Sequence, residues 1–249
     1  MKQLPILFRH DDIQTLYPNI RGFYGFVSRG VKRGEIKQIK KGIYALVDRS
    51  TNEIYANRFQ IASRLFDDAY FSYHEALDYY GLATQSFVSR FCYLTHVYVK
   101  DLEVGEVVFH AKKSECPLEI IDRMKEEGVR LVSLERAIVD SIDNPSLGGG
   151  LEEIEGALAH CPDLNVEAIE KLLAFYDKAF LYQKVGYLFE KHFGNRIPDS
   201  FYAHCLTKIG NKINYFEAKV GFSKLVLKWR LMVPQEGQNL DELLQELSE

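Results

Sequence analysis

The first hydrophobic pattern along the chain predicts an amphipathic helix. Asn19 can cap a helix that runs from Ile20 to Arg33 and ends at Gly34. At 100° per residue its apolar face comprises Ile20, Phe23, Tyr24, Val27 and Val31. The opposite, polar face comprises Arg21, Gly25, Ser28, Arg29 and Lys32. We therefore expect the first set to face a core and the second to face solvent.

Two short β-rich runs follow this helix. They cover residues 35–39 and 43–47, and Gly42 between them can supply the positive φ of a tight hairpin. Upstream, residues 11–17 predict a short helix that Pro18 ends. Helix, turn, helix and basic hairpin, in this order, are typical of a winged helix-turn-helix.

Beyond residue 50 the pattern changes to longer helices and β-branched runs. Residues 91–111 predict two or three strands, residues 223–233 a closing strand, and residues 240–249 an amphipathic acidic helix. Helices are expected at 57–65, after Ser72, and at 134–142, 152–159, 166–174 and 175–193. The sequence predicts an α+β fold, with an N-terminal winged helix-turn-helix at 1–50 and a larger mixed α/β C-terminal domain at 51–249.

The charge is distributed unevenly between these two parts. The formal charge of the whole chain is only -4. Ten cations against four anions give residues 1–50 a charge of +6, and residues 51–249 carry -10. A short basic segment joined to an acidic body indicates a module that binds polyanions, followed by a second part that does not bind them.

The basic segment supplies the candidate DNA contacts. A helix that enters the major groove must present donors to base edges and phosphates, and lysines at a hairpin tip can reach phosphates beside it. The candidate contacts are Arg21, Gly25, Ser28, Arg29, Lys32, Lys37, Lys40 and Lys41. Gly22 and Gly25 each cost a helix roughly 1 kcal/mol relative to Ala. Close approach of DNA to the helix backbone would explain the glycine at position 25, and a frayed or shorter helix is the alternative. The alternative is a solvated cationic module without a nucleic-acid ligand.

No motif gives positive support for catalysis, a metal site or a cofactor. The glycines at 148–150 lack a following Lys-Ser/Thr, so we expect a turn with helix-capping glycines. His74-Glu75 lacks the second histidine of a zinc protease, and we expect His74 to be either a surface residue at a helix start or a packing residue. The aromatic residues between 70 and 80 predict a core. Cys205 beside His204 is only a sequence neighbour pair.

Two carboxylate pairs leave an enzyme open as a third hypothesis. Asp67 with Asp68, and Asp140 with Asp143, could hold Mg²⁺ for a nuclease-like reaction. No basic or glycine-rich phosphate loop accompanies either pair. Roles in solvated loops and helix caps are therefore favoured.

The chain is expected to be cytoplasmic. Its four cysteines are too sparse for a disulfide framework and show no CxxC spacing. Its first twenty residues lack the pattern of a signal peptide, and no apolar run is long enough to span a membrane.

Five segments, spread over nearly the whole chain, form an ordered set of motifs. They are GEIKQIKKGIYAL at 34–46, YFSYHEALDYYGL at 70–82, LVSLERAIVDSIDNPSLGGGLEEI at 131–154, KVGYLFE at 184–190 and LKWRLMV at 227–233. Taken together and in this order, they resemble the AbiEi-type antitoxins of bacterial abortive-infection toxin–antitoxin systems.

The resemblance implies a DNA-binding antitoxin that represses its own operon. Its winged helix-turn-helix would bind inverted repeats in double-stranded operator DNA, and its C-terminal domain would counteract a nucleotidyltransferase toxin. The family's DNA contacts would correspond to Arg21, Ser28, Arg29, Lys32, Lys40 and Lys41. The short segment before Asp11 and the two helix glycines depart from the family pattern. The alternative is a small-molecule-responsive transcription regulator without a toxin partner.

Overall fold

The computed structural model describes residues 4–65, 69–87, 89–97, 99–122, 129–216 and 223–234. The fold is mixed, with helices and several small sheets, which confirms the expected α+β class. The chain forms two compact units. Unit 1 comprises Met1–Ala76 and Ser86–Ser133, and unit 2 comprises Leu77–Gln85 and Leu134–Glu249. Unit 1 includes residues on both sides of position 50, and the expected domain boundary there stays a prediction.

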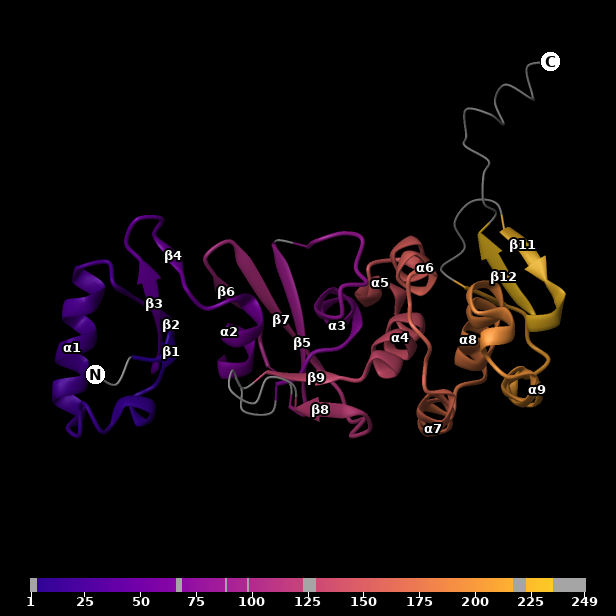
Figure 1. The fold of residues 1–249 in the computed structure, drawn as a ribbon, viewed down its shortest axis with the longest axis horizontal. Helices are drawn as coiled ribbons and strands as arrows, with labels where there is room; N and C mark the ends of the chain where they lie inside the picture. Colours follow the sequence, from indigo (N-terminus) through magenta and orange to yellow (C-terminus); the bar gives the residue numbers. More distant parts are fainter. Residues whose placement is uncertain are drawn as a thin grey trace, which may run out of the picture. The chain divides into compact units, whose positions relative to one another are not determined.

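Unit 1 begins with a helix on a small antiparallel sheet (Figure 1). The strands lie in the order β1-β3-β2, and β4 pairs with the far end of β3. The elements are β1 (Leu7–Phe8), the 3-10 helix η1 (Asp11–Ile13), α1 (Ile20–Lys32), β2 (Ile36–Lys40), β3 (Ile43–Asp48) and β4 (Glu53–Ile54). The helix and hairpin therefore form where the hydrophobic pattern predicts them.

The helix predicted at residues 11–17 is largely wrong. Only Asp11–Ile13 is helical, as a single 3-10 turn with Ile13 buried beneath it. Arg9 N–H donates to Asp12 Oδ2 at 2.7 Å, which gives this carboxylate a partner outside the helix. Pro18 then separates the turn from Asn19, whose side chain caps α1 as expected by accepting from Arg21 N–H at 2.8 Å.

The core of this segment is aromatic. Phe8, Phe23 and Tyr44 pack with ring centroids 5.7 to 6.5 Å apart, and Val27 and Ile36 complete the cluster. A Cβ added at Gly30 would lie only 2.4 Å from Ile36 Cδ1, so the missing side chain lets α1 approach β2.

The face of α1 that packs on the core differs from the predicted one. Phe23, Val27 and Gly30 are buried. Ile20, Tyr24 and Val31, all expected to point inward, are 45%, 53% and 47% exposed. The buried face includes a glycine, which the hydrophobic pattern does not count.

The rest of unit 1 contains two further sheets. In the sheet β5-β7-β6, β5 runs parallel to β7 and β6 antiparallel to it, and β8 and β9 form an antiparallel pair. Phe71 packs against Phe59 and Phe91 with ring centroids 5.1 and 5.3 Å away, which confirms the expected aromatic core. The elements are α2 (Arg58–Leu65), α3 (Tyr73–Tyr79), β5 (Arg90–Thr95), β6 (Leu102–Val104), β7 (Val107–Lys113), β8 (Ile120–Asp122) and β9 (Arg130–Val132).

Unit 2 is mainly helical. Asp177 adopts a left-handed conformation (φ 46°) and ends α7, so the helix expected from residue 175 begins at Ala179 instead. The helices are α4 (Leu134–Asp143), α5 (Pro145–Gly148), α6 (Leu151–Ala159), α7 (Val166–Tyr176), α8 (Ala179–His192), η2 (Gly194–Arg196) and α9 (Asp199–Lys208). Gly149 and Gly150 have φ of 94° and 97° between α5 and α6, as expected of capping glycines.

The single strand predicted at residues 223–233 is wrong. The segment forms β11 (Ser223–Val226), η3 (Leu227–Trp229) and β12 (Leu231–Pro234), and β11 pairs antiparallel with β12. Arg230, with φ 50°, makes the reversal, and β10 (Asn214–Tyr215) joins β12 in parallel. Trp229 is fully buried against Gly186 of α8, which lies beside this sheet in Figure 1.

Some expectations concern residues that the structure does not describe. They are the Asp67–Asp68 pair and the acidic tail from Leu240. Among the described helices, none combines the length and the apolar character needed to cross a lipid bilayer.

Candidate nucleic-acid interface

The polar face of α1 points away from the core of unit 1. Arg21, Ser28, Arg29 and Lys32 are exposed, and Gly25 between them is half-buried. They lie opposite Phe23, which is 1% exposed. The structure therefore brings the five predicted helix residues together on one solvent-facing surface, here called the basic face.

The cations of this face differ from others nearby in lacking acidic partners. Arg33 pairs with Glu35 at 2.8 Å, and Arg64 pairs with Asp12 at 3.0 Å. Within the described part of the chain, no carboxylate lies within ion-pair distance of Arg21, Arg29 or Lys32. Helix α1 itself contains no acidic residue. No carboxylate of the described residues therefore forms an ion pair with these three cations.

Helix stability explains only part of this charge. Arg29 and Lys32 lie in the last turn, where cations interact favourably with the helix dipole. Arg21 lies in the first turn, where the dipole disfavours a cation. The helix dipole therefore does not account for the charge at Arg21.

The Arg29 guanidinium approaches Gly25 on the basic face. A Cβ added at Gly25 would lie 3.4 Å from Arg29 Nη1, which is an ordinary van der Waals contact, so an alanine would fit there. Contact with Arg29 therefore does not require the glycine, which has an expected cost of roughly 1 kcal/mol of helix propensity.

The three lysines of the β2–β3 hairpin lie in two different places, at its tip and on one face of the sheet. Lys41 is exposed and Lys40 half-buried at the β2–β3 turn, where Gly42 has φ 84°. Ile36 faces α1, and consecutive strand residues point to opposite faces, so Lys37 projects from the face of the sheet away from α1. The structure therefore places Lys37 apart from the basic face, whereas Lys40 and Lys41 lie at the hairpin tip.

The carboxylates considered for Mg²⁺ in unit 2 have protein partners. Asp140 is 3% exposed and pairs with buried Arg136 at 3.2 Å, and Tyr176 also donates to it. Asp143 pairs with Lys178 at 2.6 Å. Asp140 is thus a buried ion-pair residue rather than the solvated helix-cap residue that we expected. Among the described residues, no group of three or more His, Cys, Asp and Glu side chains is arranged to hold a metal ion.

The fold creates one triad-like arrangement that sequence spacing does not reveal. Cys92 on β5 is in parallel register with His110 on β7, and His110 Nδ1 lies 2.7 Å from Asp101 Oδ1. Burial and then the nearby Glu75 carboxylate raise the pKa of Cys92 to about 12. Because the thiolate is the nucleophile, this arrangement does not favour catalysis near neutral pH.

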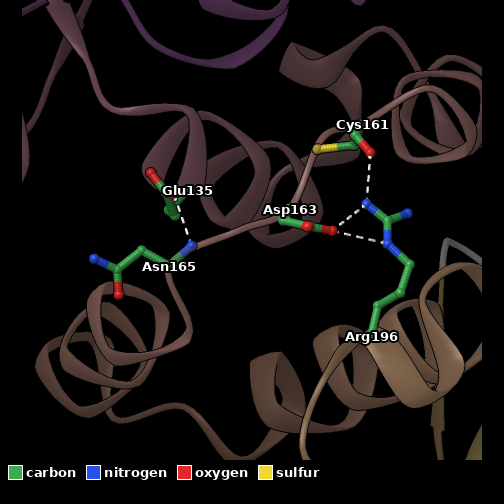
Figure 2. Close-up of polar contacts among 5 residues, drawn as sticks. All are labelled: Glu135, Cys161, Asp163, Asn165 and Arg196. Carbon is green, nitrogen blue, oxygen red and sulfur yellow. Dashed lines mark hydrogen bonds and ion pairs between the residues drawn. The ribbon is translucent and has the colours of Figure 1, made fainter.

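A second polar cluster joins α6 and α7 in unit 2. Figure 2 shows Arg196 donating to Asp163 Oδ1 at 2.9 and 3.0 Å and to the Cys161 carbonyl at 3.0 Å. Glu135 accepts from Asn165 N–H at 2.9 Å, and the Asn165 side chain caps α7. Burial raises the pKa of Cys161 to about 12. The cluster fixes the connection between two helices, which is a structural role.

The remaining histidine and cysteine candidates also have structural environments. His74 is 2% exposed, with its ring 4.4 Å from that of Phe87, which confirms that it packs. Cys205 is fully buried, and its burial raises its pKa to about 12. The basic face is therefore the candidate site that retains accessible, chemically competent groups.

Comparisons with known proteins give a fold relative. No protein-family model matches the chain, and no curated protein matches it. The structure is similar to the crystal structure of the RV2827C protein from Mycobacterium tuberculosis, with a TM-score of 0.65. The match covers 98% of this chain and 90% of that chain, at 15% sequence identity. At this identity the likeness shows a shared fold.

Proposed function

We propose that this protein is a DNA-binding antitoxin that represses its own operon and counteracts a nucleotidyltransferase toxin. In this proposal residues 1–50 act as a winged helix-turn-helix module on inverted repeats in double-stranded DNA. The ordered motifs shared with AbiEi-type antitoxins support the toxin–antitoxin context. The observation that most directly supports DNA binding is the basic face of α1. There Arg21, Arg29 and Lys32 are exposed and have no acidic partner among the described residues.

The proposal gives each element of this segment a role. Helix α1 would be the recognition helix in the major groove, with its basic face toward the bases and phosphates. The β2–β3 hairpin would act as the wing, with Lys40 and Lys41 beside the groove. The single 3-10 turn at Asp11–Ile13 stands where a first helix of the motif is expected, so the proposal relies on α1 and the hairpin.

Binding to the protein's own upstream DNA tests the proposal. About five neutralised phosphates predict a slope between -4 and -5 in a plot of log affinity against log salt concentration. The double substitution Arg29→Glu with Lys32→Glu should weaken binding at least 100-fold and make the slope shallower by about 2. Fluorescence anisotropy between 50 and 300 mM salt measures both.

A matched variant controls for overall charge. Lys171→Glu with Lys208→Glu changes the charge equally at two exposed lysines of α7 and α9 in unit 2. It should bind DNA within a factor of about three of the wild type. Equal loss in both variants, or salt-independent binding by the wild type, contradicts the assigned interface.

The antitoxin function needs its own test. Expression of the neighbouring nucleotidyltransferase gene alone should stop growth, and co-expression of this protein should restore it. The Arg29→Glu/Lys32→Glu variant should lose repression of an operon reporter but still restore growth, since the neutralising domain is proposed to lie beyond residue 50. A harmless neighbouring gene product would contradict the toxin–antitoxin proposal while leaving DNA binding intact.

A further inference from the structure

Helix α1 carries an exposed apolar stripe that the basic face does not explain. Ile20, Tyr24 and Val31 are 45%, 53% and 47% exposed. They are spaced so that all three fall within an arc of about 40° on the helix surface. Single exposed apolar residues are common on proteins, but three in one line form a feature that needs a reason.

The stripe borders the basic face directly. Tyr24 lies one helical turn before Ser28, and Ile20 lies beside Arg21 in the first turn of α1. Gly30 and Val27 face the core on the other side of the stripe. Any ligand that lies on the basic face of α1 therefore also meets these apolar side chains.

We propose that Ile20, Tyr24 and Val31 contact thymine methyl groups and so give the protein a preference for A·T-rich operator DNA. This inference rests on the proposed DNA binding and assigns sequence preference to a different set of residues. Of the four bases, only thymine carries a methyl group in the major groove, and apolar side chains are its natural partners. The cations supply affinity that is insensitive to sequence, because phosphates are the same at every base pair.

Two other occupants of the stripe are disfavoured by its surroundings. In a dimer formed by apposing two copies through the stripe, Arg21 and Lys32 of one copy would approach the cations of the other copy, which like-charge repulsion opposes. A helix that lies in a membrane interface needs a broad apolar face, whereas this stripe is narrow and the other apolar face of α1 is buried in the core.

Replacement of thymine by uracil removes only the methyl groups and tests the proposal. The probes are two duplexes of equal length, one of alternating A·T and one of alternating A·U. The full-length wild type should bind the A·T duplex about tenfold more tightly at low salt. In the triple variant Ile20→Ala/Tyr24→Ala/Val31→Ala the ratio should fall to about one.

Two variants separate this preference from general binding and from folding. Arg29→Glu should weaken binding to both duplexes equally and leave the tenfold ratio unchanged. Leu16→Ala, which shortens an apolar side chain of 45% exposure outside α1, should leave both affinities unchanged. Thermal melting of the triple variant should stay close to that of the wild type, since its three side chains are largely exposed.

The possible outcomes distinguish the two proposals. Tight, salt-sensitive binding with equal affinity for the A·T and A·U duplexes overturns the thymine assignment but leaves DNA binding standing. No salt-sensitive binding to either duplex overturns both. If the duplex ratio of the triple variant is unchanged, two results would assign the stripe to another partner. One is a wild-type dimer that becomes a monomer in the triple variant, and the other is wild-type binding to phosphatidylserine vesicles that the triple variant loses.

Discussion

Arg29 Nη1 lies 3.4 Å from the position that a Cβ on Gly25, one helical turn earlier, would take. This distance is an ordinary van der Waals contact, so a methyl group at Gly25 would fit beside the guanidinium. An added Cβ at Gly22 has nothing within 4 Å. A methyl group at position 25 would therefore stand on the basic face beside its arginine, whereas one at position 22 would contact nothing.

We expect Gly25→Ala to weaken DNA binding several-fold while raising stability. Alanine improves helix propensity by up to about 1 kcal/mol and fits beside Arg29, but its methyl group would keep DNA from approaching the helix backbone closely. Gly22→Ala should give the same stabilisation without loss of affinity. Thermal melting and DNA anisotropy on both variants measure these effects, and unchanged affinity in Gly25→Ala would show that DNA does not approach the backbone closely at Gly25.

Gly30→Ala should destabilise unit 1 by about 1–3 kcal/mol. The new methyl group would lie 2.4 Å from Ile36 Cδ1 and 2.8 Å from Cγ1, so one of the two elements must shift. The second substitution Ile36→Val removes Cδ1 and should restore part of the stability. Denaturant unfolding of the single and double variants gives the coupling, and strictly additive losses would contradict the contact.

Gly186→Ala should be more damaging in unit 2, by at least about 3 kcal/mol. Its Cβ would stand 2.2 to 2.8 Å from the ring of Trp229, which is rigid and fully buried. Trp229 is the only tryptophan in the chain, so its fluorescence reports this site directly. A wild-type emission spectrum and unfolding midpoint in the variant would contradict the packing described.

The stability of unit 2 should decline in acid partly through Glu190. Burial alone would raise the pKa of Glu190, but hydrogen bonds from Lys228 and Trp229 Nε1 lower it below its ordinary value. A carboxylate with a lowered folded-state pKa stabilises fully above its unfolded pKa of about 4.3, and this contribution is lost as the pH falls through the folded value.

Glu190→Gln should therefore cost stability at pH 7 and much less at pH 3. Denaturant unfolding followed by Trp229 fluorescence at pH 7, 5, 4 and 3 should show a shallower decline for the variant than for the wild type. Parallel profiles of stability against pH for the two proteins would mean that Glu190 contributes nothing to the loss of stability in acid.

The register and contacts of the β5-β7-β6 sheet could not be predicted from the pattern of residues. Strands in residues 91–111 follow from their alternation, but the pairing of Cys92 with His110 depends on β5 and β7 running parallel. The break in residues 223–233 escaped prediction because Arg230 takes a positive φ without the glycine that normally signals one. Tertiary packing around Trp229 holds this turn.

The basic face and the stripe beside it show where local and tertiary information divide. The position of α1, its cap at Asn19, the Gly42 hairpin and the spacing of the cations are local properties, and the sequence by itself determined them. The direction in which α1 faces its core was decided by packing, because Gly30 offers no hydrophobic side chain yet gives Ile36 the closest approach. That rotation leaves Ile20, Tyr24 and Val31 outside, next to Arg21 and Ser28 instead of beneath them.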